Sequence, residues 1–176
     1  MPRKSADITR SKTARKSPAD AVRVPAPGEG KRGEEGYLGY LLRQAHAAVR
    51  LTMERTLADL GVTSPQFAVL TMLKAYPGLS GADVARLTFL TPQTVGVIIR
   101  NLERDGAIEM TPHPVHGRIQ QWTLTPRGTK LLTACRERVI ALEKRLARNL
   151  DGDAETMVRR WLAGIAADLQ EDQDEA

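Results

Sequence analysis

Apolar residues recur at helical spacing in two short segments in the middle of the chain. The first segment, residues 80–88, begins at Ser80 and has Asp83 three positions later, which is an acidic form of the capping box that starts many helices. Val84 and Leu87 are three residues apart, so they share one face of this helix. The pattern therefore predicts a short amphipathic helix with a defined start.

The second segment begins after a short break at Phe89 and Leu90. Thr91 is suited to cap a helix there, and Pro92 then occupies the first helical position, where its fixed φ is favourable and its missing N–H has no cost. One face is apolar and consists of Val95, Ile98, Ile99 and Leu102. The other face consists of Gln93, Thr94, Val97, Arg100 and Asn101. The sequence thus predicts a helix that is buried on one side and presents a largely polar side to a partner.

Two short strand patterns follow this helix. Gly106 is placed to end the helix as a left-handed cap. Residues 107–110 and 119–124 then favour strands on either side of a turn that contains Pro and Gly. A helix, a tight turn, an exposed helix and a hairpin in this order predict a winged helix-turn-helix whose second helix is offered to DNA.

Longer helical patterns flank this region. Before it, residues 37–60 carry one apolar stripe that Gly61 ends, and Ser64-Pro65 begins another helix. After it, Thr125 and Pro126 again place a capping residue and a proline at the start of a helix. A narrow apolar seam of coiled-coil type follows at Leu132, Cys135, Val139, Leu142 and Leu146. A last helix carries Val158, Trp161, Leu162, Ile165 and Leu169. These stripes are wider than a small winged domain covers, which indicates that the two ends of the chain pack together.

Two short motifs in this region resemble the MarR family of bacterial transcription regulators. Residues 102–106 match the family's Leu-Glu-x-x-Gly at the end of the recognition helix, and residues 124–128 match its Leu-Thr-x-x-Gly at the start of the helix after the wing. Arg118 lies where the family carries its wing arginine. The resemblance covers roughly residues 37–169. It implies a mostly α fold with a small β-hairpin wing.

The resemblance also implies a function and a division of the chain. The function is that of a repressor that binds a palindromic operator on double-stranded DNA as a homodimer and is released by a small-molecule effector. The expected parts are a disordered basic tail (1–36), an N-terminal dimerisation helix (37–62), a winged helix-turn-helix domain (63–124), C-terminal dimerisation helices (125–170) and an acidic tail (171–176).

The sequence departs from the family pattern at three sites. Met110 stands where the family usually has Arg, and His116-Gly117 replaces the usual Asp-Arg before the wing arginine. Gly96-Val97 lies where Thr-Arg is common. These departures leave fewer basic groups facing the groove.

Charge is distributed unevenly along the 176 residues. The net charge is +5, and residues 1–36 hold nine Lys and Arg against five Asp and Glu, so most of the excess lies in the tail. The tail has no apolar period, which predicts disorder, and it either extends the DNA footprint or aids solubility. We expect a cytoplasmic protein without a membrane segment, because no apolar run is long enough for a signal peptide or a span.

The candidate DNA contacts lie on the second helix and on the wing. They are Thr91, Gln93, Thr94, Val97, Arg100, His116 and Arg118. Gln93, Thr94, Val97 and Arg100 are candidates to read base edges: Gln93 suits adenine, and Thr94 or Val97 suits a thymine methyl group. Arg118, after a glycine at the hairpin tip, suits the narrow minor groove of an A·T tract. A solvated helix face and a lone surface arginine would give the same residues.

Gly96 has two interpretations, because glycine is a poor helix former. It serves either a close approach to the sugar-phosphate backbone or tight packing against the preceding helix.

Other residues suggest ligand chemistry more weakly. His46 and Arg50 lie one turn apart, so they either bind an anionic ligand or form hydrogen bonds between subunits. His113 and His116 have metal-like spacing, but nearby Cys or carboxylate partners are lacking, so no metal site is expected. Cys135 occupies a seam position, which favours a buried small hydrophobe over a redox sensor.

The composition argues against an enzyme and against bound cofactors. It offers three scattered histidines, one seam cysteine, no phosphate-binding loop and no paired acid-base arrangement. The remaining alternative is an architectural protein that coats DNA without sequence preference. A footprinting experiment separates the two, because a regulator protects a palindromic site and a coating protein does not.

Overall fold

The computed structural model describes residues 23–112 and 120–174. The tip of the wing lies outside these ranges. The predictions for His113, His116 and Arg118 therefore lie outside the described residues. The chain divides after Gln44 into two units, which are described one at a time.

In the first unit, residues 23–36 belong to the segment predicted to be disordered, and the structure gives them local hydrogen bonds. A short 3₁₀ helix, η2, spans Gly30–Arg32. Arg32 donates from Nη1 to the carbonyl oxygen of Pro25 at 2.7 Å, and Arg23 pairs with Glu29 at 3.3 Å. These bonds join charged side chains to a backbone carbonyl and to a carboxylate, so they do not depend on an apolar period.

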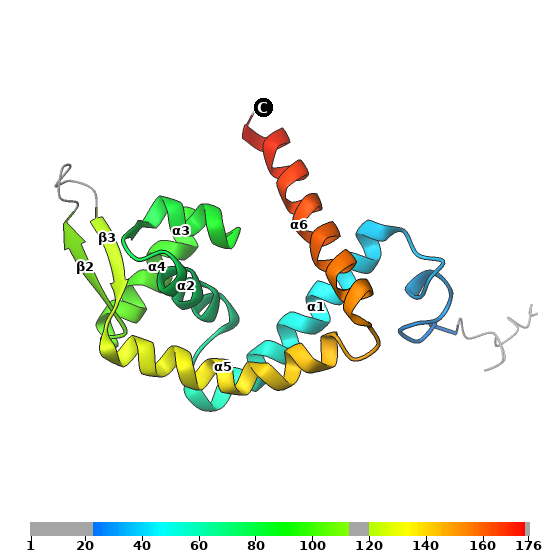
Figure 1. Cartoon of the computed structure of the whole chain (residues 1–176), viewed down its shortest axis with the longest axis horizontal. Helices are drawn as coiled ribbons and strands as arrows, with labels where there is room; N and C mark the ends of the chain where they lie inside the picture. The colour runs from blue at the N-terminus through cyan, green and yellow to red at the C-terminus, as the bar shows by residue number, and fades with distance from the viewer. Residues whose placement is uncertain (1–22, 113–119, 175–176) are drawn as a thin grey trace, which may run out of the picture. The chain divides into compact units, whose positions relative to one another are not determined.

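The chain is mostly helical and contains one small antiparallel sheet, which confirms the predicted fold class (Figure 1). The elements are α1 (Leu38–Leu57), η3 (Ala58–Leu60), α2 (Ser64–Ala75), β1 (Leu79–Ser80), α3 (Gly81–Thr88), α4 (Pro92–Arg104), β2 (Ile108–Pro112), β3 (Gln120–Leu124), α5 (Pro126–Leu146) and α6 (Gly152–Asp174). The sheet order is β1-β3-β2, so the hairpin has a third, two-residue strand in which Leu79 pairs with Trp122.

Capping residues set the helix starts. Ser80 and Asp83 form the predicted capping box, and Thr91 and Thr125 accept hydrogen bonds from the backbones of α4 and α5. The start of α2 differs by one residue, because Thr63 is the cap and forms its own capping box with Gln66.

Helix α6 extends further than the sequence predicted. It is helical through Asp174, in the segment assigned to an acidic tail. Gln and Glu favour helices, and neither Gly nor Pro interrupts residues 165–174.

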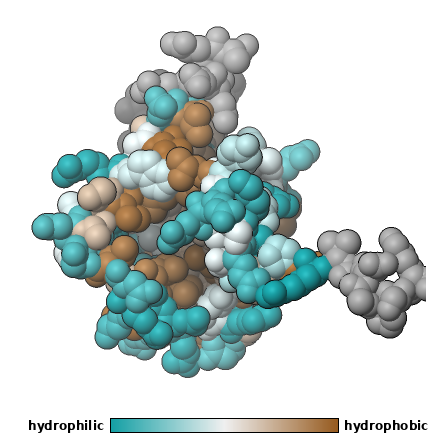
Figure 2. All heavy atoms as spheres, turned by 90° about the vertical axis from the view of Figure 1, so that its right-hand side faces the viewer, coloured by the Kyte–Doolittle hydropathy of each residue, from teal (hydrophilic) through white to brown (hydrophobic). Residues whose placement is uncertain are grey.

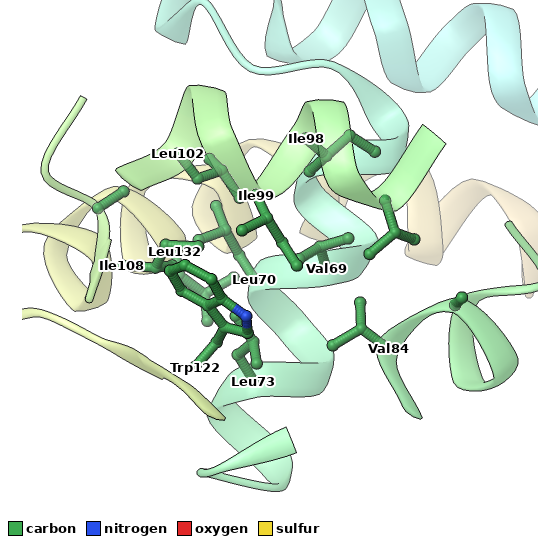
Figure 3. Packing of buried hydrophobic residues seen from close by; sticks show 13 residues of the cluster. Val69, Leu70, Leu73, Val84, Ile98, Ile99, Leu102, Ile108, Trp122 and Leu132 are labelled. Carbon is green, nitrogen blue, oxygen red and sulfur yellow. The ribbon is translucent and has the colours of Figure 1, made fainter. Parts of the chain in front are cut away.

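The main hydrophobic core joins α2, α3, α4, the sheet and the start of α5. Figure 3 shows Trp122 among side chains from α2 and α4. The buried members of this core include Val69, Leu70, Leu73, Val84, Val95, Ile99, Leu102, Ile108, Trp122 and Leu132. The prediction that Leu87 shares the buried face of α3 with Val84 is wrong. Ala85 is buried instead and Leu87 is 42% exposed, because the core contacts this short helix along Val84 and Ala85.

A second cluster contains two residues of the seam predicted along α5. Cys135 and Val139 pack with Leu57 and Val62 of the same chain, so this part of the seam is filled within the subunit. Phe67 and Leu131 pack against both clusters.

Apolar side chains also remain at the surface, as the view in Figure 2 shows for one side of the molecule. On α6 the exposed ones are Met157, Trp161, Leu162 and Leu169.

Candidate nucleic-acid interface

Helix α4 separates cleanly into a buried face and an exposed face. Val95, Ile98, Ile99 and Leu102 are buried in the main core. Thr91, Gln93, Thr94, Val97 and Arg100 are all exposed, and Val97 retains 49% of its surface. The helical period therefore placed Gln93, Thr94, Val97 and Arg100 on the outer face as predicted, whereas Asn101, predicted on the same face, is half-buried. Thr91 is the cap that precedes the helix.

Thr91 fixes the first turn of this face. Its Oγ1 accepts a hydrogen bond from the backbone N–H of Thr94 at 3.2 Å, and the two hydroxyl oxygens are 2.8 Å apart. The Thr91 and Thr94 hydroxyls are thus held side by side. Pro92 begins the helix beside them and also occupies the surface.

Gly96 lies on α4 without close neighbours from α3. A methyl group built on its Cα would meet only the Nη1 atom of Arg100, at 3.5 Å, which is ordinary contact with the end of a flexible side chain. The interpretation that Gly96 serves tight packing against the preceding helix is therefore wrong. The absence of a side chain leaves the backbone of α4 accessible beside Val97 and Arg100.

Charge on this face comes chiefly from Arg100. Within the described ranges Arg100 forms no ion pair, whereas Arg86 of α3 pairs with Asp83 and Arg104 pairs with Asp105 at 3.0 Å. The Ser80 hydroxyl donates to Oδ2 of Asp83 at 2.6 Å, and this bond, with the nearby Arg86, lowers the pKa of Asp83. Asp83 therefore stays ionised and neutralises part of the charge that α3 would present to DNA.

The turn between α3 and α4 contains a residue that the sequence analysis missed. Phe89 has φ 54° and ψ 35°, and it is the one non-glycine residue with positive φ in the described part of the chain. Its N–H bonds to Arg86 O, and the N–H of Leu90 bonds to Ala85 O at 3.1 Å, which together form a Schellman motif with Phe89 in the position that glycine usually takes. A side chain in this conformation costs about 1 kcal/mol. The Phe89 side chain is nevertheless 68% exposed.

The wing strands bring Met110 and Trp122 opposite each other. Trp122 is buried and Met110 is exposed, so the substitution of Met for the family's Arg leaves an uncharged side chain at the surface of the wing.

The two residues considered for ligand binding lie on α1. His46 and Arg50 are exposed, and Arg50 donates from Nη1 to Glu54 at 2.6 Å, one turn further along. The Glu54 carboxylate thus already balances this cation. A role for His46 and Arg50 in holding an anion stays a prediction.

Cys135 is fully buried, as its seam position predicted, and burial raises the pKa of its thiol, with a smaller contribution from Asp59. A neutral buried thiol is a poor nucleophile. Among the residues that the structure covers, we find no grouping of three His, Cys, Asp or Glu suited to a metal ion. None of the described helices combines the length and the apolar character required to cross a membrane.

Comparison with known proteins identifies the family. The sequence profile of the MarR family matches residues 60–119. The HTH-type transcriptional repressor Rv2887 of Mycobacterium tuberculosis is 34% identical over 135 residues, which are 77% of this chain and 97% of the relative.

Solved structures agree with this assignment. The transcriptional repressor CouR bound to a 23-mer DNA duplex has a TM-score of 0.69 and 28% identity, over 75% of this chain and 94% of CouR. The MarR family protein Rv2887 in complex with salicylic acid has a TM-score of 0.61 and 34% identity, over 75% of this chain and 98% of Rv2887. An identity of this level over nearly the whole of the relative, together with the shared fold, shows common descent. The chain therefore belongs to the MarR family.

Proposed function

We propose that this protein is a cytoplasmic transcriptional repressor that binds a palindromic operator as a homodimer and is released by a small-molecule effector. The observation that carries the proposal is the division of α4, whose apolar side is buried in the core while Gln93, Thr94, Val97 and Arg100 face outward. The names of Rv2887 and CouR as repressors, and the DNA duplex bound to CouR, support the same conclusion.

The residues of α4 would divide the work of recognition. Gln93 is suited to a bidentate contact with adenine, and Thr94 and Val97 are suited to thymine methyl groups. Arg100 would read a base edge as well, and Thr91 would contact phosphate and fix the register of the helix in the groove. Gly96 would let the backbone of α4 approach the sugar-phosphate chain, since among the described residues only the end of the Arg100 side chain lies beside it.

The wing would complete the contact from the other side. Arg118 would enter the minor groove beside the major-groove site, and His116 would contact phosphate. With Met110 uncharged at the wing surface, Arg118 would carry most of the attraction that the wing offers to DNA.

A second copy of the chain would cover the exposed apolar residues of α6. Trp161 and Leu162 retain more than a third of their surface, and an exposed apolar stripe of this kind marks an interface. A two-fold dimer places two recognition helices about 34 Å apart, one turn of DNA, which matches a palindromic site.

The effector is proposed from the salicylic acid bound to Rv2887. His46 and Arg50 are the residues we assign to it, with Arg50 exchanging Glu54 for the ligand's anionic group. The protein would act as a regulator and not as an enzyme, since regulation is what its family does.

Selection of tight binders from a pool of random duplexes tests this function. A regulator enriches one sequence with two-fold symmetry, and footprinting then shows protection of that palindrome. An architectural protein that coats DNA binds the pool without enrichment, and that result would contradict the proposal.

A further inference from the structure

The turn of the helix-turn-helix carries an aromatic side chain, Phe89, that is mostly exposed in the described part of the chain. Phe89 occupies the left-handed position of the Schellman motif that ends α3, where glycine is free of strain. The packing that usually accompanies this motif comes from Leu90, which is partly buried against the main core. Phe89 itself is 68% exposed, so within the described chain the burial of its ring does not offset the free-energy cost of the left-handed backbone.

The location of Phe89 connects it to the recognition helix. Two residues later, Thr91 caps α4 and fixes its first turn. Phe89 lines a surface groove together with Arg86, Thr91 and Pro92, and Gln170 of α6 lies at the same groove. The ring is therefore next to the end of α4 that presents Gln93 and Thr94, and it is continuous with the surface proposed to face DNA.

We propose that Phe89 is a DNA contact, in which the ring packs against the deoxyribose groups of the strand that borders the major groove. This inference rests on the proposed function as a DNA-binding regulator. Strained residues that persist at the surface are found at binding sites, where an interaction outside the fold offsets their cost. An uncharged ring suits the apolar edge of the sugars, while Arg86 on the same groove is balanced by Asp83.

The proposed contact has a distinct physical signature. A ring on sugars reads no base, so its loss weakens binding to every duplex by the same factor. It also displaces no counterions, so the dependence of affinity on salt concentration stays unchanged. A phosphate contact made by a Lys or Arg side chain would differ, because its removal reduces the magnitude of this slope by about 0.9.

The test is the full-length variant Phe89→Gly, measured for both stability and DNA binding. Glycine relieves the left-handed strain, so the melting temperature should rise by about 2–4 °C at fixed protein concentration. The Kd for the selected duplex should increase about tenfold, with an unchanged slope of log affinity against log salt. Phe89→Tyr, which keeps the ring, is the matched control and should bind within about twofold of the wild type.

Other outcomes would overturn the inference. A lower melting temperature for Phe89→Gly would show that the ring packs within the fold, and dissociation in sedimentation would show that it contacts the second subunit. Unchanged affinity would show that it contacts nothing on the duplex. If the wild-type protein retains no duplex from a random pool, the proposed DNA-binding function itself fails, and that result is separate from any result on Phe89.

Discussion

Replacement of Gly128 by Ala should unfold the junction between the recognition helix and α5. Gly128 is buried in the first turn of α5, and a Cβ there would lie 1.9 Å from the carbonyl oxygen and 2.8 Å from the carbonyl carbon of Ala107. Both atoms belong to the backbone, so no side-chain rotation relieves the overlap. The first turn of α5 would have to move away from Ala107 by about 1 Å or more before the contact became tolerable.

That movement would break the bonds that hold the junction. Thr125 donates from its backbone N–H to Ala107 O at 3.1 Å and from its hydroxyl to Gly106 O at 2.7 Å. Each is worth about 0.5–1.5 kcal/mol, and overpacking adds about 1–3 kcal/mol. We expect Gly128→Ala to lower the free energy of unfolding by about 3–4 kcal/mol, a large part of the roughly 5–15 kcal/mol that stabilises a typical domain.

Urea denaturation followed by circular dichroism measures this loss. Gly96→Ala is the matched control, because it adds the same methyl group to a helix but meets only the end of the Arg100 side chain. It should raise the free energy of unfolding by about 0.5–1 kcal/mol through helix propensity. If Gly128→Ala unfolds at the same urea concentration as the wild type, the close contact with Ala107 is refuted.

Three further predictions concern recognition, pH and assembly. Gln93→Ala should relax preference at one base pair per half-site by about 1–3 kcal/mol, whereas Arg118→Ala should weaken binding mainly at sites with A·T-rich flanks. Duplex selection with each variant measures this, and equal weakening of all sequences would contradict both roles. Asp83→Asn should cost about 1 kcal/mol of stability near neutral pH by weakening the capping box. Folding lowers the pKa of Asp83, so the wild type should be more stable than Asp83→Asn by the full amount above about pH 4. This difference in unfolding free energy should disappear as the pH falls through the pKa of Asp83 in the folded state. Urea melts at several pH values measure it, and a difference that stays constant with pH would contradict the prediction. Ile165→Asp should place a charge in the apolar interface and dissociate the dimer, and an unchanged sedimentation coefficient would place the interface elsewhere.

Local signals in the sequence were sufficient to predict the helix starts. A capping residue and a following proline act over about four residues, so Thr91 and Thr125 located the starts of α4 and α5 without knowledge of the fold. Strand β1 could not be predicted in this way. Leu79 and Ser80 become a strand only because they pair with Trp122 and Gln121, which lie far away in the sequence.

The candidate interface was predicted in part. The helical period was enough to separate the two faces of α4, since a helix half buried in a core must expose the other half. The period failed for Leu87, because eight residues of α3 offer the core only a short line of contact. Phe89 was recognised only as a break between helices. Its left-handed backbone depends on the hydrogen bonds that end α3. The sequence has no glycine at this position, which is the usual indication of a left-handed helix end.

The packing of Phe67 and Leu131 affects how the protein unfolds. Each packs against both hydrophobic clusters, so the two clusters are joined by side chains that they share. A region built in this way unfolds cooperatively, so residues 53–139 should melt in a single transition, and the winged helix-turn-helix should not unfold before the rest. The same two side chains link the packing around Leu57 and Cys135 to the main core beneath α4.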